Sequence, residues 1–460
     1  MNAATLAVPL LVALAATPAQ SAAPALPLLA IGGRGVQKET LPLLALRGGA
    51  RGVQKPSNKA GTSSVVGGVL LHLACGAAMA TAEDTRLALL AQMAGMPLAP
   101  YLEKRAGPTG TALLATACIG TALAGKLGAT DCVADLCGAQ LSTVLLGLGV
   151  AVAYQVPLLT GSRWFPRRKG LVIGASLSGV GASAALFSSS EPGSWPLLLG
   201  LIGALLQSNP PTDWPLNAPS AAPRSYLPAL DTAWIDWLKR TGADKFFARP
   251  ARAPPAAPSK PTVVNAVFSW RFALLWVMIA CSAAATGLTA STLKLYADKH
   301  ETAKVVEMFP PSLTAKVVEM FPMAAALSIP MAAALGNALG RLLCGALSDG
   351  SGFKAPFVAL HLVLAAVGAS VTAFTAQPES FAAATVAVAF ITGGTFSLVP
   401  AQLMRSYGDL GASVYALLFS AFGCAALGVP LLLDAALKKG GFVYPGLAVA
   451  AAALAAVVSV

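Results

Sequence analysis

The chain has 460 residues, of which 56% are hydrophobic and only 11% are charged. A soluble domain carries about 25% charged residues, so this composition excludes a soluble enzyme or binding module and is typical of an integral membrane protein. The net charge of +12 is therefore not interpreted as a sign of nucleic-acid binding. The positions of the Lys and Arg residues along the chain indicate instead how the protein is oriented in the membrane.

Residues 1–62 are predicted to form a tail ahead of the first membrane span. Residues 1–30 are apolar with an Ala-rich end, similar to a signal peptide, but no basic residue precedes the apolar run. Residues 31–60 carry six Lys or Arg and a single Glu, as a transit peptide does. We expect a poorly ordered cytosolic tail, with organelle targeting as the alternative.

The remainder contains two sets of apolar runs long enough to cross a bilayer, which takes about 20 residues. Six spans, a polar segment and six more spans form a two-fold repeat at the level of architecture. The predicted parts are a tail at 1–62, a first half at 63–208, a linker at 209–267 and a second half at 268–460. The expected spans are 63–82, 85–101, 109–128, 138–160, 170–189, 194–208, 268–293, 321–347, 355–376, 380–404, 410–432 and 441–459.

The linker is rich in Pro, Asp, Lys and Arg, and one short amphipathic helix is expected near Thr232–Lys239. Placing the linker and both chain ends in the cytosol puts most of the Lys and Arg on that side, as the positive-inside rule requires. We expect a multi-pass protein of the plasma membrane, with an organelle membrane as the alternative. The basic turn that includes Arg167 and Arg168 is expected to meet anionic lipid headgroups.

Short duplications surround the start of the eighth span. Thr302–Pro310 recurs at Thr314–Pro322, and Pro322–Leu327 recurs at Pro330–Leu335. They are too short and too few for a solenoid, so we interpret them as tandem microduplications that leave the outer end of this span uncertain.

Cysteine and histidine are scattered along the chain. Cys132 and Cys137 share one short loop, where a disulfide is an open alternative because the spacing is unspecific. The three histidines, at positions 72, 300 and 361, lie far apart in sequence, so neither a metal site nor another cofactor is expected.

Arg341 lies in one of the most apolar stretches of the chain. Its guanidinium keeps its charge, and a charge within a bilayer costs at least a few kcal/mol. On a helix Asn337, Arg341 and Ser348 share one polar face with Cys344 and Gly345, which favours a cavity over lipid. Guanidinium matches carboxylate through two parallel hydrogen bonds, so we interpret Arg341 as the ligand of a carboxylate or similar planar anion. Snorkelling toward the helix end, about 12 Å away, is the alternative.

Other polar side chains in the spans are candidates for the same cavity. His72 could couple protons, or serve only as a hydrogen bond between helices. Four more residues are expected either to line the cavity or to pack between helices: Tyr154, Gln155, Gln402 and Tyr415.

Several segments resemble a known family. Arg163–Gly170, followed by Leu171–Gly181, is similar to the junction of the fourth and fifth helices in major facilitator superfamily carriers of the oxalate/formate antiporter and monocarboxylate transporter type. Leu102–Pro108 resembles their first cytosolic loop, and the resemblance extends over about 63–460. Their G-x-L-x-D-x-x-G-x-K/R loop pattern is matched by Gly345, Leu347, Asp349, Gly352 and Lys354.

The resemblance implies an all-α, twelve-helix bundle of two six-helix halves that acts as a monomer and is not an enzyme. It implies alternating access for a small organic anion, above all a monocarboxylate, with protons or a counter-anion as further partners. Two alternatives stay open: a non-transporting sensor or scaffold, and a carrier of another small solute such as an amino acid or nitrate. The family's gating and loop roles fall on Gly345, Asp349, Lys354, Arg167, Arg168 and Glu103.

The chain departs from the family pattern at several positions. The loop lacks the arginine that follows the aspartate, and Pro100 replaces a glycine. Residues 411–432 contain no lysine, and Asn337 stands where proton-coupled relatives have an aspartate. A single fixed positive charge favours a monoanion over a dianion.

Overall fold

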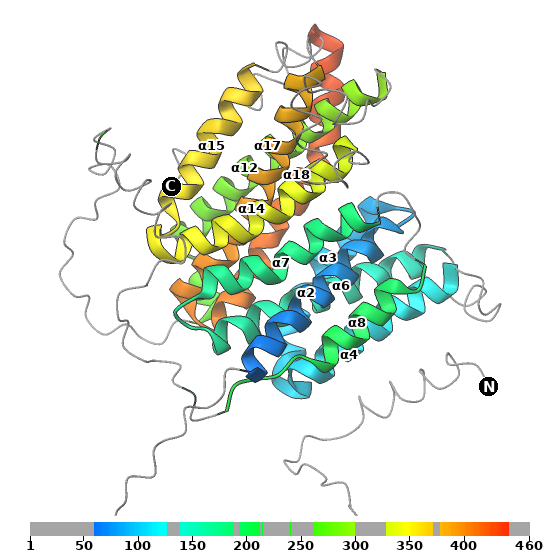
Figure 1. The fold of residues 1–460 in the computed structure, drawn as a ribbon, viewed down its shortest axis with the longest axis vertical. Coiled ribbons are helices and arrows are strands. Elements are labelled where there is room, and N and C mark those ends of the chain that lie inside the picture. Colours follow the sequence, from blue (N-terminus) through cyan, green and yellow to red (C-terminus); the bar gives the residue numbers. More distant parts are fainter. Residues whose placement is uncertain are drawn as a thin grey trace, which may run out of the picture. The chain divides into compact units, whose positions relative to one another are not determined.

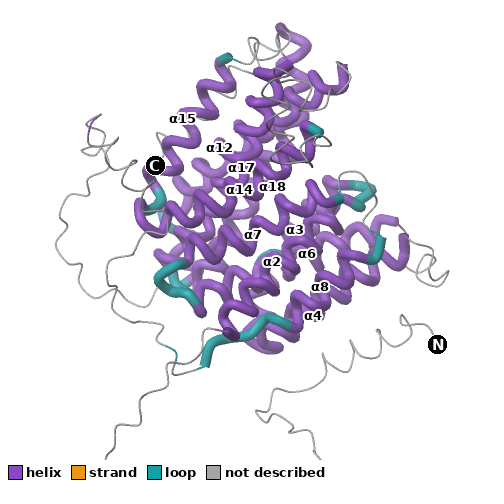
Figure 2. The backbone as a smooth tube through the Cα atoms, viewed as in Figure 1, coloured by secondary structure: helices purple, strands orange, loops and turns teal. Residues whose placement is uncertain are grey.

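The structure is a computed structural model that describes residues 59–126, 139–187, 193–211, 214, 240, 262–299, 328–370 and 378–440. Within these ranges the chain forms helices joined by turns and loops, without a strand (Figure 2). Eight of the described helices are long and apolar enough to cross a membrane. The protein is therefore a multi-pass membrane protein.

The described residues of the first half form six helices, which Figure 1 shows side by side. Helices α3 and α4 both pack against α6, and α8 packs against α4. Asp84 caps α3 by accepting hydrogen bonds from the backbone N–H groups of Arg86 and Leu87. The helices are α2 (Lys59–Ala80), α3 (Thr85–Gly95), α4 (Leu98–Lys126), α6 (Ala139–Trp164), α7 (Lys169–Leu186) and α8 (Trp195–Leu205).

The second half contributes the remaining described helices. Helix α14 packs along α17, and α12 packs along α18. Ser328 caps α14, and the chain leaves this helix through Gly352, whose φ of 78° suits glycine. The helices are α11 (Val263–Val267), α12 (Trp270–Lys299), α14 (Ile329–Ser351), α15 (Lys354–Ala369), α17 (Pro378–Tyr407) and α18 (Leu410–Gly440).

Eleven of the predicted spans correspond to described helices, and the arrangement fits the expected all-α architecture of twelve helices in two halves. The twelfth span at 441–459 lies outside the described residues. So do the expected linker helix, the Cys132 and Cys137 loop, the repeated Thr302–Pro322 segment and almost all of the tail. The predicted division into tail, halves and linker stays a prediction.

The boundary between the second and third spans differs from the prediction. Helix α3 ends at Gly95, and a new helix begins at Leu98, so most of the segment expected as a loop at 102–108 is helical. The break falls at Gly107, with φ 68° and ψ 174°, directly before Pro108. Glycine adopts this φ without strain, and proline supplies no N–H to the preceding turn, so the helix restarts in a new direction.

The two halves meet closely where α7 packs along α14 (Figure 1). A Cβ atom at Gly170 would collide with the carbonyl oxygen of Gly345, and one at Gly174 would collide with that of Arg341. Glycine therefore lets the two backbones touch. One apolar cluster also contains side chains from both halves, such as Tyr154 and Leu158 with Leu398, Tyr415 and Phe419.

Candidate anion-binding site

Arg341 is buried on α14, with 5% of its surface exposed, while Leu335 and Leu339 on the same helix are exposed. Its Nε donates to Oδ1 of Asn337 at 2.8 Å, and Nδ2 of Asn337 donates to the carbonyl oxygen of Ala389 on α17 at 3.1 Å. The side chain therefore extends away from the Asp349 end of the helix, so snorkelling toward that end does not explain how its charge is accommodated.

Within the described residues, the charge of Arg341 has no acidic partner. The ion pairs given by the described residues join Arg163 to Glu103 and Asp409, and Arg405 to Asp349. The Nη1 atom of Arg341 is buried and has no hydrogen-bond partner within the described part of the chain. Its guanidinium carbon lies 5.0 Å from the centroid of the Phe396 ring, a cation–π contact that helps to hold the group in place. A buried, partly unsatisfied guanidinium is suited to receive an anion.

Aromatic residues from both halves surround this arginine. The hydroxyl groups of Tyr154 on α6 and Tyr415 on α18 are 3.5 Å apart, and their rings stack with centroids 6.5 Å apart. The ring of His72 meets the ring of Tyr154 edge-on at 5.0 Å. Arg341 interacts electrostatically with all three groups. We refer to Arg341, Asn337, Tyr154, Tyr415 and His72 as the central site.

The two glutamines predicted to line the cavity differ in their surroundings. Gln155 is fully buried, and both of its amide atoms lack a partner among the described residues. Gln402 donates to the hydroxyl of Ser406 at 3.1 Å, close to the end of α17. The structure thus brings five of the predicted residues together and gives Gln402 a different neighbourhood.

A network of polar contacts ties α14 to the first half. The Asp349 carboxylate accepts hydrogen bonds from the backbone N–H groups of Gly170 and Leu171, each at 2.8 Å, and one from Arg405 at 3.0 Å. Arg405 also donates to the Ser348 hydroxyl at 2.6 Å. Asp349 thereby caps the N-terminus of α7 from the opposite half, where a negative charge is favoured by the helix dipole.

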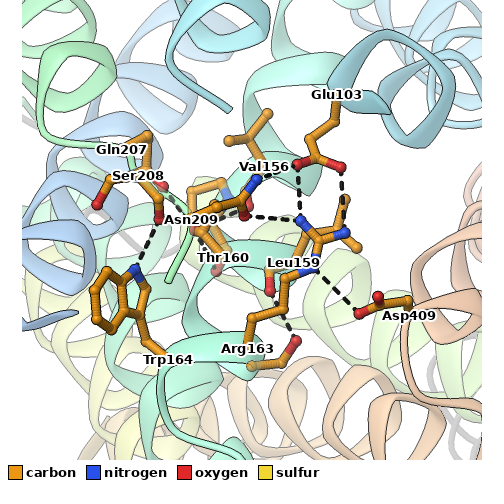
Figure 3. A network of polar contacts seen from close by, with 12 residues as sticks. Glu103, Val156, Leu159, Thr160, Arg163, Trp164, Gln207, Ser208, Asn209 and Asp409 are labelled. Atoms are coloured by element: carbon orange, nitrogen blue, oxygen red, sulfur yellow. Dashed lines mark hydrogen bonds and ion pairs between the residues drawn. The ribbon is translucent and has the colours of Figure 1, made fainter. Parts of the chain in front are cut away.

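A second network centres on Arg163 at the end of α6 (Figure 3). Arg163 donates to the two carboxylate oxygens of Glu103 at 2.7 and 3.2 Å, to Asn209 at 2.8 Å and to Asp409, the residue directly before α18, at 3.2 Å. Asn209 donates to Glu103 at 2.9 Å, which closes the network. The contacts around Asp349 and Arg163 together define what we call the junction end, where α6 leads to α7, α14 to α15 and α17 to α18.

The gating residues proposed from sequence fall partly into these networks. Glu103 and Asp349 take part directly, and Gly345 allows the close contact between α7 and α14. The side chains of Arg167, Arg168 and Lys354 are exposed. Sequence reasoning missed Arg405 and Asp409 as partners, although two charges flanking a short turn between apolar helices were a usable signal. It also missed Phe396, which a single sequence does not distinguish from other aromatic residues.

Comparison with known proteins identifies the architecture. The chain matches no protein-family profile. A crystal structure of FucP, a major facilitator superfamily transporter in the outward conformation, aligns with 86% of this chain and 97% of its own, at 11% identity and a TM-score of 0.50. The chain has the major facilitator superfamily fold. The human organic anion transporter MFSD10 covers 88% of the chain and 100% of its own at 16% identity, and its TM-score of 0.49 is too low to carry an argument.

A curated relative is similar in sequence as well. Apicoplast pyruvate carrier 1 of Toxoplasma gondii is 26% identical over 404 residues, which cover 76% of this chain and 69% of the relative. The matched proteins are transporters and not enzymes, in agreement with the prediction that this chain is not an enzyme.

Proposed function

We propose that this protein is a secondary transporter that moves a small organic monoanion, a monocarboxylate in the first place, by alternating access. The observation that carries the proposal is Arg341, a buried guanidinium that bonds to Asn337 but has no acidic partner among the described residues and keeps Nη1 unpaired. A carboxylate would supply the missing charge and acceptor together.

The surroundings of Arg341 support a small monoanion. The central site offers hydrogen-bond donors, namely the guanidinium and the hydroxyl groups of Tyr154 and Tyr415, and its described residues include no carboxylate. An amino acid would bring an ammonium group that finds no anion there, so we favour a plain carboxylate over an amino acid. The similarity to a pyruvate carrier supports the same choice.

The contacts at the junction end fit alternating access. Hydrogen bonds from Gly170 and Leu171 to Asp349, and from Arg163 to Asp409, join the two halves. We propose that these bonds close one side of the carrier and break when the halves rock apart. Since both halves belong to one chain, a monomer suffices, and the relative's name makes an organelle membrane worth testing beside the plasma membrane.

The proposal is tested by uptake of radiolabelled pyruvate, lactate and formate into liposomes that contain the purified protein. Arg341→Ala and Arg341→Lys are both expected to reduce uptake to background, since lysine supplies a charge but not two parallel hydrogen bonds. Competition by unlabelled nitrate and alanine tests the alternatives, because a carrier of monocarboxylates should be inhibited by neither.

The matched control is Arg271, an exposed arginine at the start of α12 whose guanidinium lies over Trp270. Arg271→Ala and Arg271→Lys are expected to transport like the wild type. Uptake that persists in both Arg341 variants, with their thermal unfolding unchanged, would show that this arginine is not the anion ligand. A wild type that takes up none of the three anions would favour a sensor or scaffold.

A further inference from the structure

His72 has an unusual pair of hydrogen-bond partners. It lies on α2 with 0% exposure, its Nδ1 is 2.8 Å from the carbonyl oxygen of Gly68, and its Nε2 is 3.2 Å from that of Tyr154. Backbone carbonyls only accept hydrogen bonds, and a neutral imidazole has one N–H and one lone pair. The neutral ring therefore satisfies one carbonyl and turns a lone pair toward the other. Only the doubly protonated ring donates to both.

The other buried histidine shows that this arrangement is not a general consequence of burial. His361 on α15 is also 0% exposed, and its Nδ1 lies 2.8 Å from the carbonyl oxygen of Phe357. Its Nε2 meets the hydroxyl of Ser282 at 2.6 Å, and a hydroxyl either donates or accepts. His361 is thus fully satisfied as a neutral ring, whereas His72 is not.

The groups that face His72 come from several helices. Helix α14 contributes Arg341, and α6 contributes Tyr154, whose hydroxyl meets that of Tyr415 on α18; Cys75 is the nearest titratable residue on α2 itself. Helix α7 packs Gly179 against His72 and carries only Lys169, at its first residue, as a charge. Helix α8, which packs Gly203 against Leu71 of α2, has no titratable residue. Among the described residues, the one fixed charge that acts on His72 is therefore the positive charge of Arg341.

We propose that His72 binds a proton together with the anion at Arg341, so that the carrier moves one proton with each monocarboxylate. This inference rests on the transport function proposed above. In the empty carrier, a positive charge on His72 is opposed first by burial of the ring and then by the charge of Arg341. A bound carboxylate cancels that charge, and protonation then gives both carbonyls a donor.

The coupling works equally in the other direction. If the anion favours the proton by some factor, the proton favours the anion by the same factor, because the two binding equilibria are linked. Alternating access then carries both across the membrane, and the proton is taken from water on one side and returned to water on the other. The coupling needs no acidic residue, and so it is compatible with Asn337 beside the arginine.

The test uses pyruvate uptake into liposomes with an acidic exterior, with protein-free liposomes as the background. At one proton per anion, a gradient of one pH unit supports about tenfold accumulation. The wild type is expected to reach this level and to exchange internal for external pyruvate at equal pH. His72→Gln is expected to lose the accumulation, and its remaining uptake should be the same at every external pH, because glutamine forms hydrogen bonds but does not take up a proton.

His361→Gln is the matched control and should accumulate pyruvate like the wild type. A second measurement covers the case in which His72→Gln does not fold. Wild-type protein mixed with pyruvate in weakly buffered detergent solution should take up about one proton per bound anion, as reported by a pH indicator. Accumulation by folded His72→Gln, or binding without proton uptake, would overturn the inference. Failure of the transport function itself would appear differently, as a wild type without exchange or uptake.

Discussion

The central site and the junction end use charge in opposite ways. At the junction end, Arg163 and Arg405 are each paired with carboxylates, and Asp349 also caps α7. At the central site Arg341 is more deeply buried than either of them, donates to Asn337 and has no carboxylate partner among the described residues. The paired charges hold helices together, and the charge of Arg341 is the one that we propose receives the transported anion.

This difference follows from what each region has to do. A buried charge without a partner is costly, so an arginine left without a carboxylate by the described residues fits the anion ligand that we propose. A charge that is satisfied by the chain gains little from a ligand. The comparison predicts that giving Arg341 an internal partner should harm transport more than removing a partner at the junction end.

The largest effect is expected from Asn337→Asp, which makes the central site resemble the junction end. The new carboxylate would stand where Oδ1 of Asn337 now accepts from Arg341 at 2.8 Å. It would pair with the guanidinium and repel an incoming anion, so we expect at least about a tenfold rise in the KM for pyruvate uptake, or about 1.4 kcal/mol.

Asn337→Ala is the matched control, because it removes the hydrogen bond to Arg341 without adding a charge. Its KM should rise less than that of the aspartate variant. Equal effects of the two substitutions would mean that Asn337 acts by positioning Arg341, and that an internal carboxylate does not compete with the substrate.

An intermediate effect is expected from Asp349→Asn. The substitution removes the charge that caps α7 and pairs with Arg405, while the amide oxygen still accepts some of these hydrogen bonds. We expect a loss of about 1–3 kcal/mol of stability, seen as a lower thermal unfolding temperature in detergent. Because the contact joins the halves, Cys344 on α14 should also react faster with a thiol reagent in a variant that keeps no other cysteine.

The control is Asp84→Asn, an exposed helix cap at which asparagine caps as well as aspartate. Its unfolding temperature and thiol reactivity should match those of the parent. If Asp349→Asn also matched the parent in both measurements, the contact with α7 would not hold the junction end closed.

The sequence alone predicted most of the helices but few of the contacts between them. Apolar runs of span length located eleven helices, because a bilayer imposes both length and composition. The polar face around Arg341 was readable because helical spacing groups residues three and four apart. The partners of Arg163 and Asp349 were not readable, because Asp409 and Gly170 lie far from them along the chain and only the folded bundle brings them together. The break at Gly107 falls within the loop expected at 102–108, whereas the helical conformation just before it was missed, because the charged residues there also fit a loop.

The smallest effect is expected where a junction contact is most exposed to water. Arg163 pairs with Asp409, whose side chain is 70% exposed, and with Glu103, whose side chain is 4% exposed. An exposed ion pair contributes about 0–1 kcal/mol, so Asp409→Asn should leave both the unfolding temperature and pyruvate uptake close to the wild type. Glu103→Gln leaves the same arginine without its buried partner and should cost about 1–3 kcal/mol. Equal losses in the two variants would mean that the exposed bond between the halves stabilises this network as much as the buried bond within the first half. The junction end would then depend on a contact that has to break in every transport cycle.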